Sequence, residues 1–214
     1  MKKATCGILF GLLIMAAFSV QAGEKQAKVD DASIQQYYAA VGKFYNVPER
    51  AVGTIKKKGI SDEELAVVFF IADRAGLKPA PVIELRDLKK SWLDITLHFG
   101  LSPEIYYVPV TVDPGPPYGK AYGYFKKHPR NEWKQIQLSD AEIVNLTNLR
   151  MVSKLYGVTP DEVIAWRCEG KHFAQVNLNA KELRDQKKAE AKANKSRGAK
   201  ARAEANENRE KKDK

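Results

Sequence analysis

The sequence has almost no cysteine and no hydrophobic run long enough to cross a membrane comfortably. Its only cysteines are Cys6 and Cys168. Removal of a secretory signal would leave Cys168 alone, so no disulfide can form within one mature chain. We expect the Cys168 thiol to be buried, because a free cysteine behaves mainly as a small hydrophobic residue; pairing with another chain is the alternative. The longest apolar run, from Cys6 to Val20, is shorter than the roughly 20 residues of a membrane helix.

Motifs of the common enzyme classes are also missing. The sequence contains no Walker loop, no Rossmann glycine pattern, no His-Glu-x-x-His and no Gly-x-Ser-x-Gly. Two pairs have the spacing of a helical site: Cys168 with His172, and Asp94 with His98. Gly170 is expected to end the helix of the first pair, and the second is expected to be a local helix-stabilising pair. We therefore predict no enzyme, no cofactor and no metal site, with an envelope enzyme as the alternative.

The amino terminus is typical of a secretory signal peptide. Met1-Lys2-Lys3 supplies the charged start, the apolar run follows, and Val20-Gln21-Ala22 has the small residues of a cleavage site. We predict a signal peptide at residues 1–22, a linker at 23–30 and a periplasmic or secreted mature protein. A retained amino-terminal anchor is the alternative, and no membrane span is expected after cleavage.

Most of the positive charge lies at the carboxyl end. Residues 181–214 contain thirteen Lys or Arg and seven Asp or Glu, and so contribute +6 of the formal net charge of +10. Two further charges belong to Lys2 and Lys3, which leaves a body close to neutral. Any contact with a polyanion is therefore expected from the tail. Because the tail has almost no apolar residue after Leu183, we predict a frayed or disordered extension that contacts anionic surfaces or only increases solubility.

The body has the signals of short helices. Ser61 and Ser139 are each followed three residues later by glutamate, which is the capping-box pattern of a helix start. After Ser61, apolar residues cover most of the circumference of the expected helix. We therefore expect this helix to lie at the centre of the core.

An internal repeat is the most informative feature of the body. A segment that begins at residue 76 aligns without a gap with one that begins at residue 157, so matched residues lie 81 positions apart. Residues 45–49 match the start of both segments and mark a further, earlier unit. Glycine is suited to a left-handed helix cap and proline to the first helical position. Such a repeat constrains the fold more than the chemistry. The matched positions that we assign to the repeat are Gly76, Pro79, Arg86 and Trp92 in one copy and Gly157, Pro160, Arg167 and Phe173 in the other.

The second copy resembles a known kind of repeat. A helix, a Gly-Val-Thr-Pro turn and a second helix with Val163, Ile164 and Arg167 are similar to the short helix–turn–helix-like repeats of uncharacterised exported bacterial proteins. The resemblance covers about residues 45–176 and implies a helical repeat fold with no activity to transfer. Sequence-specific DNA binding is not expected, because the body is nearly neutral and export is predicted.

The repeated arginines have two interpretations. We expect Arg86 and Arg167 to pair with acidic neighbours or to cap helix carbonyls. The alternative is that either guanidinium binds a carboxylate or phosphate ligand in a bidentate way.

Between the two copies lies a segment rich in proline, glycine and tyrosine, which we predict to be a loop at residues 108–137. Its prolines and glycines exclude a long helix, and its many aromatic residues argue against disorder. Tyrosines interleaved with lysines are suited to stacking on sugar rings while the cations contact anionic groups. We nevertheless expect the aromatic rings to fold back onto the helices, with a ligand site as the alternative. The candidate ligand-binding residues are Tyr118, Lys120, Tyr122, Tyr124, Lys126 and Arg130.

The sequence therefore predicts an all-α fold of repeated helix–turn–helix units. Units one and two occupy residues 31–107, the aromatic loop 108–137, unit three 138–180 and the basic low-complexity tail 181–214. The predicted function is a non-enzymatic binding or scaffolding module of the bacterial envelope, with a cell-wall polymer or an envelope protein as its partner. The first alternative is an envelope enzyme. The second alternative is binding of polyanions or nucleic acid by the tail.

Overall fold

The computed structural model describes residues 29–210, except for the side chains of residues 200, 201 and 203–210. These residues form an all-α fold with short 3-10 turns between some helices. The predicted signal peptide and the linker up to residue 28 lie outside the described residues. The α-helices are α1 (Asp31–Phe44), α2 (Glu49–Lys56), α3 (Leu65–Ala75), α4 (Pro79–Asp87), α5 (Trp92–His98), α6 (Gly119–Lys127), α7 (Asp140–Tyr156), α8 (Pro160–Cys168) and α9 (Phe173–Glu210). The 3-10 turns are η1 (Asp62–Glu64), η2 (Pro103–Tyr106) and η3 (Arg130–Gln135).

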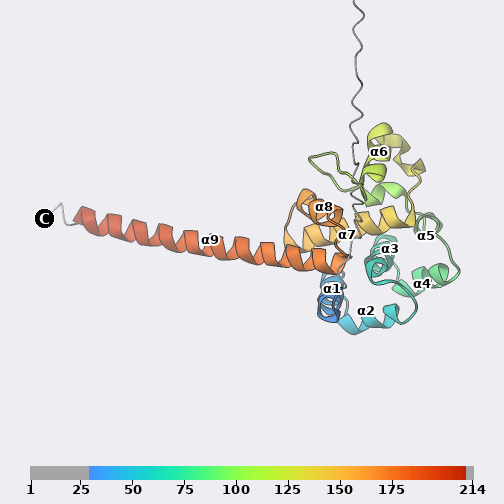
Figure 1. Cartoon of the computed structure of the whole chain (residues 1–214), viewed down its shortest axis with the longest axis horizontal. Coiled ribbons are helices and arrows are strands. Elements are labelled where there is room, and N and C mark those ends of the chain that lie inside the picture. Colours follow the sequence, from blue (N-terminus) through green and yellow to red (C-terminus); the bar gives the residue numbers. More distant parts are fainter. Residues whose placement is uncertain (1–28, 211–214) are drawn as a thin grey trace, which may run out of the picture.

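The core forms around α3 and α7, which pack against each other at the centre of the body (Figure 1). Every residue of α3 from Leu65 to Ala72 is buried, as predicted for the helix that follows Ser61. The buried residues of α7 include Ile143, Leu146 and Leu149. Burial of apolar area contributes about 25 cal/mol per Å², so these two helices supply much of the stability of the body.

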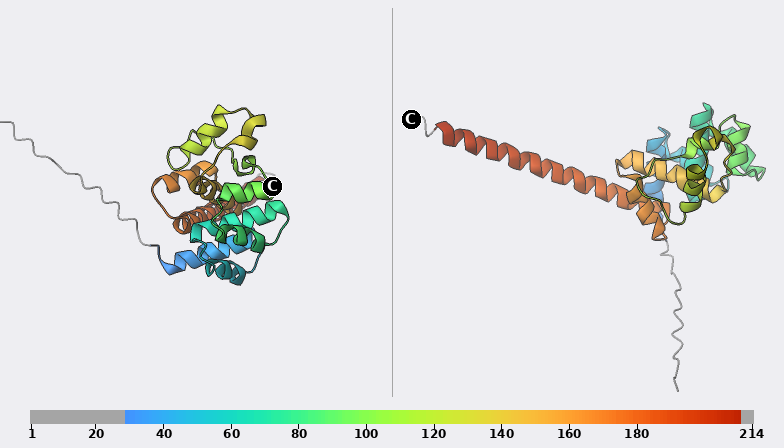
Figure 2. Two further views of the ribbon diagram at one scale, coloured as in Figure 1. Left: turned by 90° about the vertical axis from the view of Figure 1, so that its right-hand side faces the viewer. Right: turned by 90° about the horizontal axis from the view of Figure 1, so that it is seen from above.

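The other helices cover this central pair. α1 packs against α2, α7 and the first turns of α9, and α8 packs against α7 and α9. α4 contacts α3, and α5 returns to α7. α6 and η3 lie at the end of the body opposite α1 and α2 (Figure 2). Beyond its first turns, α9 leaves the body and extends away from it as a straight rod (Figures 1 and 2).

The predicted helix ends are confirmed. Ser61 and Ser139 both form capping boxes, and after Ser61 the chain makes the turn η1 before α3 begins. Gly76 and Gly157 end α3 and α7, each with a φ of 67°. Only glycine adopts this left-handed conformation without strain, so a side chain at either position would disfavour the turn. The prolines at the first positions of α4 and α8 are Pro79 and Pro160.

Two segments differ from the prediction. Residues 108–137 are not a continuous loop, because they contain α6 and η3. The tail is not frayed within the described residues: α9 passes through Gly198 and continues to Glu210, and the predicted boundary at residue 180 falls inside this helix. Alanine, lysine, arginine and glutamate all have high helix propensity, so the ~1 kcal/mol cost of one glycine does not interrupt the helix.

Candidate functional site

Two of the three tyrosines that were considered as a stacking surface for a ligand are buried. Tyr118 is 1% exposed and Tyr122 is 7% exposed. The Tyr122 hydroxyl donates to the carbonyl of Val108 at 2.6 Å, which ties α6 to the segment before it. Burial raises the pKa of Tyr118, so its phenol stays protonated. Both rings are part of the core, as expected for aromatic rings that fold back onto the helices.

Four aromatic rings hold this part of the chain against the body, and we call them the aromatic cluster: Tyr107, Tyr122, Phe125 and Trp133. Neighbouring ring centroids lie 4.6 to 6.5 Å apart, in tilted or edge-to-face arrangements. The indole N–H of Trp133 donates to the carbonyls of Phe125 (3.1 Å) and His128 (2.9 Å). The aromatic residues of the segment are therefore used for packing.

Two pockets flank Tyr107. One has a volume of about 420 Å³ and lies between α6 and residues 110–113; on its wall Lys126 forms an exposed ion pair with Asp113 at 2.5 Å. The other, of about 330 Å³, contains Arg130, whose guanidinium lies 4.9 Å from the centre of the Trp133 ring. Lys126 and Arg130 thus belong to different pockets. The remaining pair of candidates, Lys120 and Tyr124, contact each other, with the ammonium 5.9 Å from the ring centre.

Arg86 lies where α4 meets η1 and α7. Its guanidinium pairs with Glu64 of η1 at 2.5 Å and with Asp140, the first residue of α7, at 2.6 Å. It also donates to the carbonyl of Lys90 (2.9 Å) and lies 4.5 Å from the centre of the Trp92 ring. Burial by itself lowers the pKa of Arg86, but the two carboxylates outweigh it and raise the pKa above its usual value. Through these contacts Nη1 and Nη2 join α4 to η1 and α7.

Arg167 has a corresponding set of contacts in α8. Its guanidinium pairs with both carboxylate oxygens of Glu63 at 3.1 Å, and its Nε donates to the side-chain oxygen of Asn145 at 3.1 Å. It also donates to the carbonyl of Lys171 (2.7 Å) and lies 4.6 Å from the centre of the Phe173 ring. Both arginines therefore have the structural contacts that the first interpretation of the sequence expected. The Arg86 side chain is also 21% exposed and lines a hollow of about 270 Å³.

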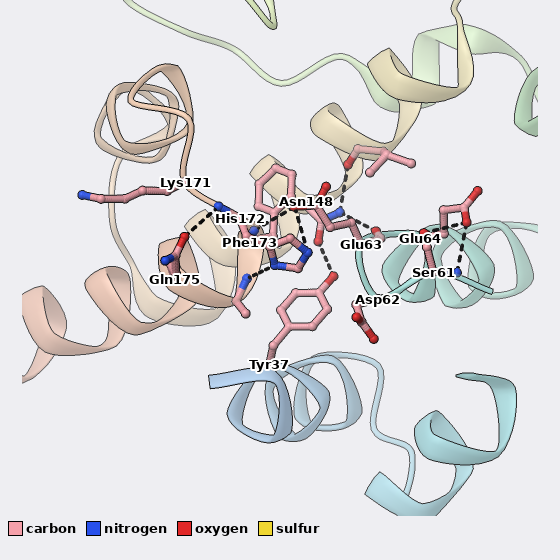
Figure 3. A network of polar contacts seen from close by, with 12 residues as sticks. Tyr37, Ser61, Asp62, Glu63, Glu64, Asn148, Lys171, His172, Phe173 and Gln175 are labelled. Atoms are coloured by element: carbon pink, nitrogen blue, oxygen red, sulfur yellow. Dashed lines mark hydrogen bonds and ion pairs between the residues drawn. The ribbon is translucent and has the colours of Figure 1, made fainter. Parts of the chain in front are cut away.

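A polar network surrounds Glu63 (Figure 3). The Tyr37 hydroxyl donates to the side-chain oxygen of Asn148 at 2.5 Å, and the Asn148 amide donates to the main-chain carbonyl of Glu63 at 2.8 Å. The Glu63 carboxylate accepts the main-chain N–H of Phe173 at 2.9 Å and faces Nε2 of His172 at 3.5 Å. Burial raises the pKa of Tyr37 well above its usual value, so the phenol remains a donor. The network joins α1, η1, α7 and α9 through groups that are already paired.

The two residue pairs that were considered as sites do not form them. The expected burial of the Cys168 thiol is wrong, because the residue is exposed; its Sγ donates to the carbonyl of Pro116 at 2.9 Å. Partial burial of this thiol raises its pKa, which disfavours the reactive thiolate. Asp94 accepts from Ser91 in a capping box, so its carboxylate stabilises a helix start. Within residues 29–210 there is no group of three or more His, Cys, Asp or Glu side chains placed to hold a metal ion.

A stripe of basic side chains runs along α9, and we call it the basic stripe. At 100° per residue, its six members fall within an arc of about 80° and span about 30 Å of helix. Between residues 181 and 202 no acidic residue lies within that arc. Sequence reasoning missed the stripe because it searched the tail for an apolar face; separations of three, four and seven between the basic residues were the available signal. The members are Lys181, Arg184, Lys188, Lys192, Lys195 and Arg202.

The two parts of α9 have opposite environments. Five residues of its first turns are buried against the body: Phe173, Ala174, Val176, Asn177 and Ala180. From Asp185 to Ala199 every residue is exposed. The helix therefore holds most of the basic stripe in solvent while its base is part of the core (Figure 1).

The chain has no match among known proteins: no family model, no curated protein and no solved structure matches it. No helix within residues 29–210 combines the length and the apolar composition that a membrane span requires. Functional interpretation therefore depends on the geometry described above.

Proposed function

We propose that this protein is a non-enzymatic, exported envelope protein in which a helical body acts as a scaffold and α9 binds an anionic cell-wall polymer. The observation that carries the proposal is the basic stripe, which lies mainly on the solvent-exposed part of a helix whose base is built into the core. A linear array of cations is suited to a linear polyanion, because each cation that pairs with a fixed negative charge releases condensed counterions.

The base of α9 supports this role. The Glu63 carboxylate accepts the main-chain N–H of Phe173, the first residue of α9, and so places a negative charge at the positive end of the helix dipole. Val176 and Ala180 are fully buried one turn apart. The direction of the helix is thus fixed by contacts with the body, so a bound polymer would be held at a defined place relative to the scaffold.

The composition of the exposed part favours a polymer over a membrane surface. Helices that lie in a lipid interface bury a face of leucine and aromatic residues among the acyl chains. After Leu183, the described part of α9 has alanine as its only apolar residue. Attraction to the stripe is therefore electrostatic, and a membrane would gain little from apolar contact.

As part of the same proposal, the scaffold is built from two related helix–turn–helix units. One contains η1, α3, α4 and α5, and the other contains α7, α8 and the start of α9. In each unit an arginine donates to the carbonyl four residues later, stacks on the ring six residues later and pairs with an acidic residue of the other unit. The two arginines, Arg86 and Arg167, would then lock the units together.

The glycan-binding loop and the envelope enzyme receive less support. Tyr118 and Tyr122 are buried, so stacking on a sugar would require α6 to leave the body. The pocket of about 420 Å³ is the available place for an enzyme site, but its acid and base, Asp113 and Lys126, are exposed and paired with each other.

Co-sedimentation with cell-wall sacculi tests the proposal. Sacculi that carry their anionic polymers are compared with sacculi from which the polymers have been removed by mild acid. We expect binding to the first only, and we expect Lys192→Gln/Lys195→Gln to weaken it about tenfold and to reduce the slope of log K against log salt by about two units.

The matched control is Arg197→Gln, which is compared with the single stripe variant Lys195→Gln and removes the same charge from another face of the same helix. Lys187 is unsuitable as a control because its ammonium already pairs with Glu162 at 3.0 Å. Arg197→Gln should weaken binding clearly less than Lys195→Gln. Equal weakening by both variants would show non-specific attraction to net charge, and equal binding to stripped sacculi would show that the polymer is not the ligand; either result contradicts the proposal.

A further inference from the structure

A small hollow lies at the base of α9, where this helix passes α1. Its volume is about 180 Å³, which is below the usual range of about 300–1,000 Å³ for pockets that hold drug-sized ligands. It therefore has the size for one compact chemical group. The lining residues are Gln36, Ala39, Ala40 and Lys43 of α1, Tyr156 of α7, and Asn177, Lys181 and Arg184 of α9.

The lining includes a buried hydrogen-bond donor with no partner. Asn177 is 0% exposed, and its side-chain oxygen accepts from the Tyr156 hydroxyl at 2.8 Å. This bond leaves the two N–H groups of the Asn177 amide for other partners, and within the described residues Nδ2 has none. Buried donors are almost always paired, so an orphan donor in the wall of a hollow indicates a place for an acceptor.

Three cations surround the same hollow. Lys43 is exposed and has no ion-pair partner within residues 29–210, and the Lys181 ammonium donates to the neutral side chain of Gln36 at 2.9 Å. The Arg184 guanidinium lies 5.1 Å from the centre of the Tyr156 ring. The one acidic group in contact with these cations is Asp185, which pairs with Arg184 at 2.8 Å and does not line the hollow. The local charge therefore favours an anion.

We propose that this hollow is a binding site for a phosphate group. One oxygen of the phosphate would accept from the Asn177 amide, while Lys43 and Lys181 neutralise its charge from the two helices. Charge-assisted hydrogen bonds of this kind are stronger than neutral ones. A tetrahedral oxyanion supplies both an acceptor for the Asn177 amide and a negative charge for the surrounding cations.

The position of the hollow connects it to the basic stripe. Asn177, Lys181, Arg184 and Lys188 follow one another at separations of four, three and four residues, so they lie on one face of α9. A polymer whose terminal phosphate sits in the hollow would continue along the stripe. This extension to a polymer rests on the proposed function, whereas the phosphate site itself does not.

Nuclear magnetic resonance tests the site directly, through the side-chain amide signals of Asn177 during titration with inorganic phosphate. We expect saturable shifts of these signals. Lys43→Gln, a change on the surface of α1, should weaken binding at least fivefold, whereas Lys57→Gln, an equally exposed lysine outside the hollow, should leave it unchanged. Asn177→Asp removes both the donor and its signal, so this variant is followed through the main-chain amide of Lys181, which lines the same hollow. Phosphate should no longer shift that signal, with the fold checked by the signals of α3 and α7.

Further titrations identify the source of the phosphate. The same signals are followed with poly(glycerol phosphate), and with phosphatidylcholine vesicles that contain or lack phosphatidylglycerol. A response to the polymer assigns the site to a polymer end, a response to phosphatidylglycerol assigns it to a lipid headgroup, and a response to inorganic phosphate alone assigns it to the free ion. All three support the phosphate site.

Two results would overturn the inference: absence of any shift at Asn177 at saturating phosphate, or an equal response of the Lys43 and Lys57 variants. Failure of the phosphate site is distinguished from failure of the proposed function by measuring phosphate binding and sacculus binding for both the unchanged protein and the stripe variant Lys192→Gln/Lys195→Gln. If it and the unchanged protein both bind phosphate but neither binds sacculi, the proposed function fails and the phosphate site stands. If sacculi bind and phosphate does not, only the phosphate site fails.

Discussion

The body and the exposed part of α9 are stabilised in different ways, although one helix belongs to both. In the body, buried rings such as Trp92 and paired charges such as Arg167 with Glu63 hold each helix against several others. In the exposed part, the chain is helical because its residues favour helix, and each side chain contacts water. The same residue type therefore has different roles in the two regions: an arginine of the body holds the fold, whereas an arginine of the exposed part of α9 is available to a partner.

Substitution of an arginine in each region should show this contrast most strongly. Arg167→Ala leaves the Glu63 carboxylate largely buried and without its cation, since the two side chains are only 16% and 19% exposed. Breaking such a pair costs about 3 kcal/mol, so the body should unfold at a clearly lower denaturant concentration. Arg197→Ala, in the exposed part of α9, should change the free energy of unfolding by less than about 0.5 kcal/mol. Equal effects in urea unfolding would show that the two regions are not distinct.

Acid should weaken the body before it affects the exposed helix. Burial raises the pKa of Glu64, but hydrogen bonds from Ser61 and Arg86 outweigh it and hold the pKa below its usual value. A carboxylate with a lowered folded-state pKa stabilises the protein above its unfolded-state pKa of about 4.3 and loses this contribution as the pH falls through the folded-state value. We expect the midpoint temperature of thermal unfolding to decrease when the pH is lowered below about 4.5.

Glu64→Gln tests the assignment of this pH dependence. The variant should be less stable than the unchanged protein at pH 7, and the difference should shrink on acidification, because the unchanged protein alone loses the carboxylate contribution. A difference that stays constant between pH 7 and pH 3 would contradict it.

Sequence reasoning succeeded where one local rule decides the structure. The capping boxes at Ser61 and Ser139 and the glycine caps at Gly76 and Gly157 depend on residues within one turn of the chain, and all four are found. The core position of α3 followed from the number of its apolar residues. Such features need no knowledge of distant contacts.

The rest depended on contacts between distant residues. Tyr122 is buried because it packs against other rings of the aromatic cluster, including Tyr107, which lies 15 residues earlier. Its immediate neighbours in the sequence do not distinguish a buried ring from an exposed stacking ring. The partner of Arg167 lies 104 residues away, at Glu63. The hollow at the base of α9 forms only where α1 and α9 lie side by side. The sequence therefore does not show that Lys43 and Asn177 line the same hollow.

The smallest effect expected is also the most specific to the exposed helix. A methyl group at Gly198 meets no atom within 4 Å, so Gly198→Ala should add no contact and should act only through helix propensity, by about 1 kcal/mol. Circular dichroism should show slightly more helix at elevated temperature, while the unfolding midpoint of the body, followed by tryptophan fluorescence, should not move. A partner that binds the basic stripe should then bind slightly more tightly, because the variant loses less conformational entropy when the helix is ordered on binding. A shift of the body midpoint would instead show that order in the exposed helix is transmitted to the core through the base of α9.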